Sequence, residues 1–526
     1  MKTSDKDQLS QQARDAIFRR DWQTLGRAAS AMLEQLPQDA EALFLAGVHA
    51  KSQREYVAAR DYFRRGFKIE PKRHDLAVEL ASQLLRTREH AEAHRLLVSA
   101  GSRLSNSPYY SDMAATTFIG LGLPSEALPH AENAHSLQPE VDLFAGNLAT
   151  CCGFVGETAR AIELYESLLT QRPGNRRNHY FLSRLRKAVD HSHIDLMKGI
   201  LDSDPESDAR NIFLLFALGK ECEDLGLWED AFSWYDRGCR AAKGLRPDGL
   251  GLELEKLRAG ASRPVNRLTK QPDARGSGQD YKHVFIVGLP RSGSTLIERA
   301  LANHTLVQSV GETRYFEHAM EQIFGDIPTA LAEFSACDPK QNFAVANAYV
   351  EALGFRLGPE STVIEKLPLN FNFVPAIASA FPAASFIYTH REPGAACFSM
   401  YKQLFGSECL FSYDLEEVAH YYTVHSKFRD QFAKELPDRW IDVSYEQLVA
   451  EPQAVISALL ARLSLPIEAA CFSPETNSSA SMTASATQVR APIHKGASQI
   501  WRNFEPHLQP MLTVLAEGRA SENASS

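Results

Sequence analysis

The sequence predicts an α plus α/β protein, in which an all-α solenoid of helical repeats precedes an α/β domain with a parallel sheet. The first half repeats a residue pattern at a fixed spacing. The second half alternates short apolar segments with helical ones, and a glycine-rich loop follows the first of these apolar segments. We expect the solenoid over residues 1–243, a linker over 244–280 and the α/β domain over 281–526.

The repeat is defined by four alanines, Ala59, Ala93, Ala127 and Ala161, whose successive differences are all 34. A small residue lets two antiparallel helices approach closely, an aromatic residue four positions later fills the groove between units, and a proline ends the second helix. The aromatic residues and prolines that fit this scheme are Phe63, Tyr165, Pro71, Pro139 and Pro173. The pattern resembles the tetratricopeptide repeat, a helix–turn–helix unit.

The repeats are expected over roughly 10–175, with a degenerate further unit over 218–242. Between them, residues 193–211 break the phase and indicate an insertion or an irregular helix pair. Stacked repeats form a concave face that often binds peptides. The alternative is that the solenoid only supports or dimerises the second half, so a bound peptide and a homodimer both stay open.

Composition and charge exclude several classes of protein. The net charge of -9 argues against a general nucleic-acid binder. The first 18 residues lack the apolar stretch of a signal peptide, and no run approaches the ~18 apolar residues of a membrane-spanning helix. The eight cysteines contain no C-x-x-C pair, which argues against zinc and against a disulfide framework. We therefore expect a cytoplasmic protein with no nucleic-acid partner, no membrane and no metal.

The loop GLPRSGSTL, residues 288–296, follows the apolar run HVFIV and is similar to a phosphate-binding loop. Its backbone N–H groups and the helix that follows favour an anion, and Arg291 adds a forked cation. Ser294 stands where nucleotide hydrolases place a lysine, and no apolar strand ends in a good aspartate for Mg²⁺. The loop therefore predicts a metal-free, cationic site that suits transfer of a sulfuryl group from a phosphate.

Six segments over roughly 281–510 resemble, in order, the sulfotransferases that use 3′-phosphoadenosine 5′-phosphosulfate (PAPS), most of all the protein-tyrosine branch. They are PRSGSTL, GETR, EKLP, HREPGAACFSM, SYEQLV and TQVRAPIHKGASQIW. The resemblance implies PAPS as donor, 3′,5′-adenosine bisphosphate (PAP) as product and no metal. It implies an acceptor hydroxyl on a protein or peptide, with tyrosine favoured, while a carbohydrate or small-molecule hydroxyl stays open.

The same resemblance assigns residues to the donor. The loop would bind it through Pro290, Arg291, Ser292, Gly293, Ser294 and Thr295, with Arg291 on the 5′-phosphate and on the charge that develops on the leaving group. Arg391 and Ser399, eight residues apart, would contact the 3′-phosphate. Tyr445 would contact the adenine, with a core tyrosine as the alternative.

A further loop is implied to cover the 3′-phosphate through Lys495 and Gly496. His494 stands there in place of the arginine that the family has, which weakens this assignment. The small, polar residues before this loop suggest a lid that orders when the donor binds.

The catalytic residues implied by the resemblance are Glu312, Lys366 and Ser485, together with Arg291. Glu312 lies 21 residues after Arg291 and would take the proton of the acceptor hydroxyl. Lys366 would stabilise charge near the bridging oxygen, and Ser485 would lie near the transferred group. The alternatives are an acidic residue at a helix start for Glu312 and a solvated strand-end lysine for Lys366.

Two other functions compete with this interpretation. A nucleotide kinase would need the lysine and the Mg²⁺ carboxylate that the loop and strands lack. A non-catalytic repeat scaffold with a degenerate transferase domain would have no need of Glu312, Arg391 and Ser399.

Overall fold

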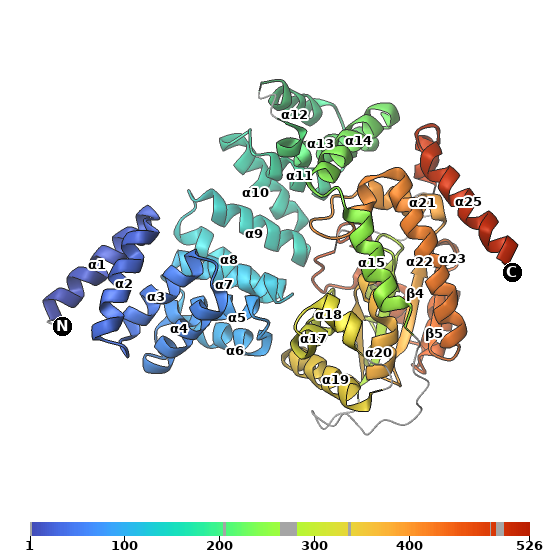
Figure 1. Cartoon of the computed structure of the whole chain (residues 1–526). Helices are drawn as coiled ribbons and strands as arrows, with labels where there is room; N and C mark the ends of the chain where they lie inside the picture. Colours follow the sequence, from blue (N-terminus) through green and yellow to red (C-terminus); the bar gives the residue numbers. More distant parts are fainter. Residues whose placement is uncertain are drawn as a thin grey trace. The chain divides into compact units, whose positions relative to one another are not determined.

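The structure is a computed structural model that describes residues 3–203, 207–263, 281–334, 338–483, 485–490 and 499–525. Its contacts divide the chain into two compact units, Met1–Val155 and Gly156–Ser526. Figure 1 shows the chain coloured along the sequence, with many of its helices and strands labelled. No helix in the described ranges combines the length and the apolar character needed to span a membrane.

The first unit is all-helical in its described part. Its helices pack in sequence order, with α3 against α4, α5 against α6 and α7 against α8. The helices are α1 (Thr3–Arg19), α2 (Trp22–Gln35), α3 (Ala40–Ser52), α4 (Tyr56–Ile69), α5 (His74–Arg86), α6 (His90–Ala100), α7 (Pro108–Gly120), α8 (Pro124–Leu137) and α9 (Asp142–Val155). This architecture confirms the predicted all-α repeat region.

The residues that defined the repeat occupy equivalent places in the helices. Ala59, Ala93 and Ala127 lie on α4, α6 and α8, and all three are fully buried. A Cβ atom added to Gly47 of α3 would lie 2.5 Å from the ring of Phe63, so the glycine makes room for the aromatic residue of the next helix. The predicted close approach of paired helices is therefore built from a small residue facing a large one.

The turn inside each repeat has a second period that the sequence alone did not reveal. Arg20, Arg54, Arg88, Gly122 and Gly156 all adopt positive φ angles, between 57° and 99°, and they are spaced by 34 residues. Glycine adopts this left-handed conformation at little cost, whereas arginine pays roughly 1–2 kcal/mol. Three of the five positions hold arginine, which hides the turn from a search for glycine.

The second unit begins with more helices of the same kind. These are α10 (Thr158–Gln171), α11 (Arg176–Leu185), α12 (Ser192–Ser203), α13 (Asp208–Asp224), α14 (Trp228–Leu245) and α15 (Gly249–Ala261). In the predicted degenerate unit, a Cβ atom on Gly219 would lie 2.6 Å from the ring of Tyr235, and Ala231 is fully buried. Gly219 and Tyr235 are 16 residues apart, as are Gly47 and Phe63, so α13 and α14 form a repeat-type pair.

The predicted domain limits do not coincide with the limits of the compact units. Helices α10 to α14, expected in the solenoid, belong to the second unit, and α15 lies in the range expected to be a linker. The rest of that range, residues 264–280, lies outside the described residues. The division at residues 243 and 280 stays a prediction, since compactness does not mark where repeats end.

A five-stranded, all-parallel sheet follows, with the strand order β2-β3-β1-β4-β5. The strands are β1 (Lys282–Gly288), β2 (Val307–Gly311), β3 (Thr362–Lys366), β4 (Ser385–His390) and β5 (Trp440–Ser444). The apolar runs HVFIVG, STVIEK, ASFIYTHR and RWIDVSYEQL predict β1, β3, β4 and β5. Strand β2 is not predicted, because Gln308 and Ser309 interrupt its apolar character. The sheet confirms the predicted α/β class.

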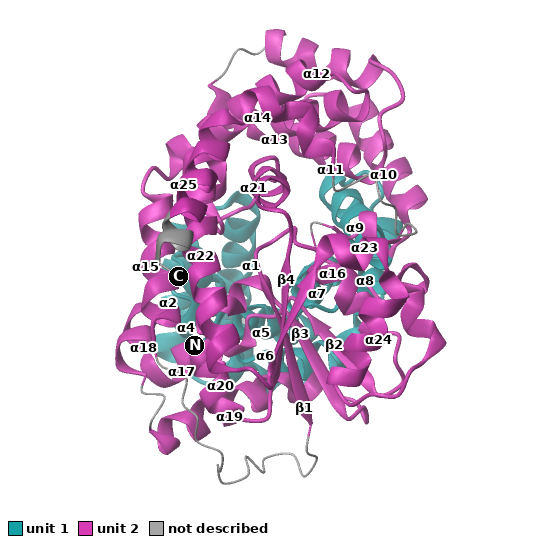
Figure 2. Ribbon diagram, turned by 90° about the vertical axis from the view of Figure 1, so that its right-hand side faces the viewer, with its two compact units in different colours: residues 1–155 teal, residues 156–526 magenta. Residues whose placement is uncertain are grey.

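Helices cover both faces of the sheet. Alternate residues of β1 point to opposite sides, so Val284 and Ile286 join one apolar core, and Phe285 and Val287 join the other. Figure 2 shows the sheet between these helices. The remaining helices are α16 (Ser294–Leu301), α17 (Tyr315–Phe324), α18 (Ile327–Glu333), α19 (Pro339–Leu353), α20 (Val374–Ala380), α21 (Pro393–Tyr401), α22 (Leu415–Glu435), α23 (Tyr445–Ala450), α24 (Pro452–Arg462) and α25 (Gln509–Ser525).

The larger core also includes the repeat-type helices of the second unit. Phe216 and Cys239 from α13 and α14 belong to the same buried cluster as Phe398 and Tyr401 of α21. Helix α15 approaches so closely that a Cβ atom on Gly260 would lie 1.9 Å from the carbonyl oxygen of Asn372. Helices α13 to α15 are therefore packed into the α/β domain.

Candidate active site

The loop between β1 and α16 is shaped by glycines that have no room for a side chain. Gly288 and Gly293 have φ angles of 143° and 97°. A Cβ atom on Gly288 would lie 2.6 Å from the carbonyl oxygen of Thr389, and one on Gly293 would lie 2.6 Å from the ring of Tyr445. The loop thus lies between β4 and Tyr445, and α16 begins directly after it.

Ser292 holds this loop against strand β4. Its side chain is buried, and its hydroxyl lies 2.7 Å from the carbonyl oxygen of Leu289 and 2.6 Å from the hydroxyl of Thr389. Ser292 is not among the residues that line the cavity in front of the loop. Its predicted contact with a donor therefore stays a prediction, while its contact with β4 accounts for its burial.

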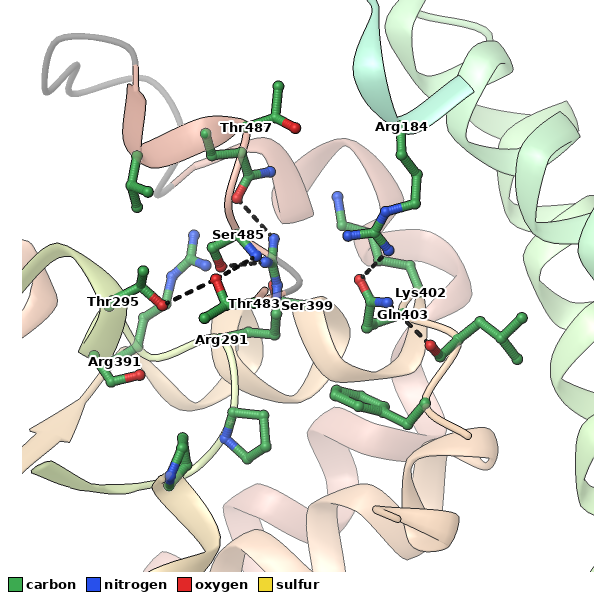
Figure 3. A pocket seen from close by; sticks show the side chains of 18 of the residues that line it. Arg184, Arg291, Thr295, Arg391, Ser399, Lys402, Gln403, Thr483, Ser485 and Thr487 are labelled. Atoms are coloured by element: carbon green, nitrogen blue, oxygen red, sulfur yellow. Dashed lines mark hydrogen bonds between the residues drawn. The ribbon is translucent and has the colours of Figure 1, made fainter. Parts of the chain in front are cut away.

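A cavity of about 790 Å³ lies in front of the loop. It brings together most of the residues singled out in the sequence, as Figure 3 shows for several of them. The predicted residues on its wall are Pro290, Arg291, Gly293, Ser294, Thr295, Glu312, Arg391, Ser399, Tyr445 and Ser485. Segments almost 200 residues apart, such as Arg291 and Ser485, meet in this cavity.

Arg291 projects from the loop toward the segment 485–490. Its guanidinium donates hydrogen bonds to the hydroxyl of Ser485 and, at 2.9 Å, to Oε1 of Gln488. Its buried Nε has no hydrogen-bond partner among the described residues. Burial lowers the pKa of Arg291 to about 10, and the charges of Arg184 and Arg391 add to this shift. A cation that is destabilised in this way favours the arrival of an anion.

Arg391 and Ser399 form a second group in the cavity. Arg391 follows β4, and its guanidinium carbon lies 4.8 Å from the ring centre of Tyr445. Burial lowers the pKa of Arg391. Ser399 lies on α21 and lines the same cavity. A guanidinium on a tyrosine ring presents its N–H groups edge-on, the orientation that suits a phosphate.

Glu312 and Lys366 form an ion pair at the carboxyl ends of β2 and β3. The ammonium of Lys366 donates to Glu312 and also lies 3.5 Å from a carboxylate oxygen of Glu298. The side chain of Lys366 is fully buried, which excludes a solvated strand-end lysine, and it lies behind the cavity wall. The side chain of Glu312 is 35% exposed and lines the cavity, so the buried lysine holds a carboxylate that faces the open space.

Several residues of the cavity were not found from the sequence. They include Arg184 of α11, Lys402 and Gln403 after α21, and Thr483. Thr483 lies 3.4 Å from Thr295, hydroxyl to hydroxyl. None of these residues belongs to a motif with its own spacing, and Arg184 precedes the recognised loop by more than 100 residues. Only the fold brings them to the site.

Two further predictions concern the loop over the 3′-phosphate and the absence of a metal. Lys495 and Gly496, expected to cover the 3′-phosphate, lie outside the described residues. Within the described ranges, no three His, Cys, Asp or Glu side chains are grouped as ligands for a metal ion. The seven cysteines of these ranges are buried free thiols.

A sequence model of the sulfotransferase family matches residues 283–469. An uncharacterized protein of Aquifex aeolicus is 29% identical over 258 residues, which cover 46% of this chain and 34% of the relative. Protein-tyrosine sulfotransferase 1 of Danio rerio is 28% identical over 196 residues, 36% of this chain and 54% of the relative. The chain thus spans about a third to a half of the length of these relatives.

Two solved structures match parts of this chain. The sulfotransferase domain from the curacin biosynthetic pathway has a TM-score of 0.33 and 17% identity, and the match covers 45% of this chain and 98% of that domain. YrrB, a TPR protein, has a TM-score of 0.30 and 15% identity, covering 36% of this chain and 97% of YrrB. The family match and the tyrosine sulfotransferase relatives identify a sulfotransferase-family domain in the C-terminal half of this chain.

Proposed function

We propose that this protein is a sulfotransferase that moves a sulfuryl group from PAPS to an acceptor hydroxyl. The observation that carries the proposal is the meeting, in one cavity of a sulfotransferase-family domain, of a glycine-shaped loop, two arginines and a carboxylate held by a buried lysine. Each of these groups matches a separate need of the reaction.

The donor brings negative charge at its 5′ and 3′ ends, and the cavity offers a cationic group for each. The loop N–H groups, the start of α16 and Arg291 would bind the 5′ end. Arg391 and Ser399 would bind the 3′-phosphate, a group that ATP lacks. The unpartnered Nε of Arg291 and the space that Gly293 leaves beside Tyr445 fit such a ligand.

Glu312 would take the proton from the acceptor hydroxyl as it attacks the sulfur. A base in contact with the attacking oxygen typically contributes ~10²–10⁴ in rate. Lys366 fixes this carboxylate in position, because its buried ammonium donates a hydrogen bond to it. Arg291 and Ser485, which are hydrogen-bonded to each other, would stabilise the charge that develops on the transferred and leaving groups.

The acceptor is proposed to be a protein or peptide. Tyrosine is favoured because some of the relatives, among them those of Danio rerio and Drosophila melanogaster, are protein-tyrosine sulfotransferases. A repeat region of the tetratricopeptide type offers a surface for such a peptide. A carbohydrate or small-molecule hydroxyl is the other substrate class that the same chemistry serves.

Thermal stabilisation by nucleotides tests the donor. We expect PAP to stabilise the protein by about 2.7 kcal/mol at 100 times its dissociation constant, and ADP or ATP with Mg²⁺ to give much less. Arg391→Ala should remove most of the effect of PAP. Arg95→Ala, on the exposed surface of α6, is the matched control and should respond like the wild type. Stabilisation by ATP with Mg²⁺ above that by PAP, or none by PAP, would contradict the proposal.

A second measurement tests the base. With PAPS and a set of tyrosine peptides, Glu312→Gln should lower kcat by about 10²–10⁴ while leaving the affinity for PAP near that of the wild type. Equal kcat values in the two proteins would remove Glu312 from the mechanism and leave the donor assignment intact.

A further inference from the structure

One wall of the catalytic cavity comes from outside the matched sulfotransferase segment. Arg184, Lys220 and Glu223 line the cavity, and they lie on α11 and α13, whereas the family match begins at residue 283. Arg184 donates hydrogen bonds to the hydroxyl of Tyr180 at 2.9 Å and to Oε1 of Gln403 at 3.0 Å. Figure 3 shows its side chain entering the cavity beside Gln403.

This wall is held firmly to the α/β domain. The hydroxyl of Tyr401 donates to Asp236 at 3.0 Å, and the thiol of Cys239 lies 3.1 Å from the carbonyl oxygen of Tyr401. Lys402 forms an ion pair of 2.5 Å with Glu223. These buried or half-buried contacts fix α13 and α14 against α21, and α11, which carries Arg184, packs against α13.

Arg184 contributes to a group of like charges. Among the charged neighbours that lower the pKa of Arg291, Arg184 has the larger effect and Arg391 the smaller. Gathering three guanidinium groups around a half-enclosed space costs free energy in the absence of a ligand. An anion that binds between them removes this cost, so the arrangement favours a ligand with more than one negative group.

The two outer arginines lie on different sides of Arg291. In Figure 3, Arg391 and Thr295 lie to one side of it, and Arg184 with Gln403 lies to the other. Arg391 also contacts Tyr445, next to Gly293, whereas Arg184 is carried by α11. A nucleotide with separate 3′ and 5′ phosphates can therefore engage the two sides with different groups.

We propose that Arg184 is a donor-binding residue, which shares the 5′-side anionic group of the nucleotide with Arg291 while Arg391 takes the 3′-phosphate. This inference rests on the proposed function and adds to it that a repeat-type helix completes the donor site.

Binding of three nucleotides distinguishes this role. Affinities for PAP, adenosine 5′-phosphate and adenosine 3′-phosphate would be measured by calorimetry on the full chain. We expect Arg184→Ala to weaken PAP and adenosine 5′-phosphate by about ten- to a hundredfold, and adenosine 3′-phosphate by less than about twofold. Arg391→Ala should show the opposite selectivity. Arg184→Lys should recover part of the lost affinity, because it keeps the charge.

Two further variants control for structure. Arg177→Ala removes an arginine of the same helix, which lies 5.2 Å from the ring centre of Phe181, and should leave all three affinities unchanged. Arg184→Gln keeps a hydrogen-bonding side chain but removes the charge, so it should behave like Arg184→Ala if the charge binds the donor. It decides the matter if the alanine variant does not fold.

The possible failures have separate signatures. If Arg184→Gln leaves all three affinities unchanged, or lowers them equally, Arg184 does not bind the donor. PAP binding by the wild type would still support the proposed function in that case. A wild type that binds none of the three would overturn both.

Discussion

Two stretches of helices share one repeat device but differ in what they pack against. In residues 1–155, the pair α3 and α4 is locked by Gly47 against Phe63, and the buried faces meet other helices of the same unit. In residues 156–261, the pair α13 and α14 is locked in the same way by Gly219 against Tyr235. The outer face of this second pair, however, enters the core of the α/β domain.

The difference shows how a repeat can be turned into part of an α/β domain. The contact between the two helices of a pair is of the same kind in both stretches. In the second stretch, aromatic residues of α14 also contact residues of the α/β domain. Trp228 of α14 meets Phe504 edge to face, and Phe232 stacks on His507 at 4.5 Å between ring centres. Such aromatic pairs typically add ~0.5–1.5 kcal/mol beyond the burial of their area.

The largest expected effect comes from shortening the chain. We compare residues 156–526, which keep the second stretch of helices, with residues 281–526, which lack it. Residues 156–526 should fold and bind PAP, because they form one compact unit. Residues 281–526 should fail to fold, because they lack α13, α14 and α15, whose apolar residues complete the core. Expression of both fragments, with circular dichroism and PAP binding, would test this. A folded, PAP-binding fragment 281–526 would show that the second stretch is dispensable.

The next effect comes from adding one methyl group at a contact of each stretch. Gly260→Ala would place Cβ 1.9 Å from a backbone oxygen, so we expect a loss of about 3 kcal/mol or more, with loss of PAP binding. Gly47→Ala meets only the ring of Phe63, and should cost about 1–3 kcal/mol without affecting PAP. Thermal unfolding with and without PAP measures both effects.

Gly199→Ala provides the matched control for these two variants. It lies on α12, and an added Cβ would meet no atom within 4 Å. Alanine favours a helix over glycine by up to about 1 kcal/mol, so this variant should be as stable as the wild type or more so. Equal losses at Gly47, Gly199 and Gly260 would mean that packing does not distinguish the two stretches.

A smaller effect concerns pH. Burial raises the pKa of Glu365 to about 7, although Tyr349 and Asn370 donate hydrogen bonds to its carboxylate. A carboxyl group whose pKa is higher in the folded state contributes stability that is complete below the unfolded value of ~4.3 and is lost as the pH rises through 7. Relative to the wild type, Glu365→Gln should therefore gain up to about 3 kcal/mol in unfolding free energy between pH 4 and pH 8.

Denaturant unfolding at several pH values measures this difference. The pKa of Asp112 in the first unit is also raised by burial, so Asp112→Asn should show a change of the same sign in the unfolding of residues 1–155. If the difference in unfolding free energy between wild type and Glu365→Gln does not change across this pH range, Glu365 titrates normally in the folded protein.

The smallest expected effect concerns ion pairs. Lys402 and Glu223 join the second stretch to the α/β domain at 2.5 Å, whereas Lys51 and Glu79 join two helices of the first unit at 2.6 Å. Double-mutant cycles with alanine should give coupling energies of about 0.5–1 kcal/mol for both pairs, since the lysine of each pair is partly solvated. A coupling energy near zero at Lys402–Glu223 would show that apolar packing alone holds this junction.

Much of this architecture could be predicted from local patterns. The spacing of the alanines predicted paired helices because each repeat packs against its neighbours in sequence. The loop was found because its glycines are required by close contacts with Thr389 and Tyr445. Features that depend only on neighbouring residues, or on a motif of fixed length, can be recognised in this way.

The rest depends on contacts between distant parts of the chain. Nothing near Arg184 in the sequence indicates that it lines the same cavity as Arg291, because the fold alone brings them together. The burial of Lys366 between Glu298 and Glu312 likewise depends on three separate elements. The αL turns at Arg20, Arg54 and Arg88 were missed for another reason, since arginine carries no signature of that conformation.

The residues that line the cavity are far apart in the sequence, so the cavity can form only late in synthesis. A repeat helix needs only its neighbours, so the first unit can fold as each pair emerges from the ribosome. The loop between β1 and α16, in contrast, is held by hydrogen bonds from Arg291 to Ser485 and Gln488, residues that are synthesised almost 200 positions later. A chain stalled before residue 485 therefore has its repeats but lacks the residues that bind Arg291.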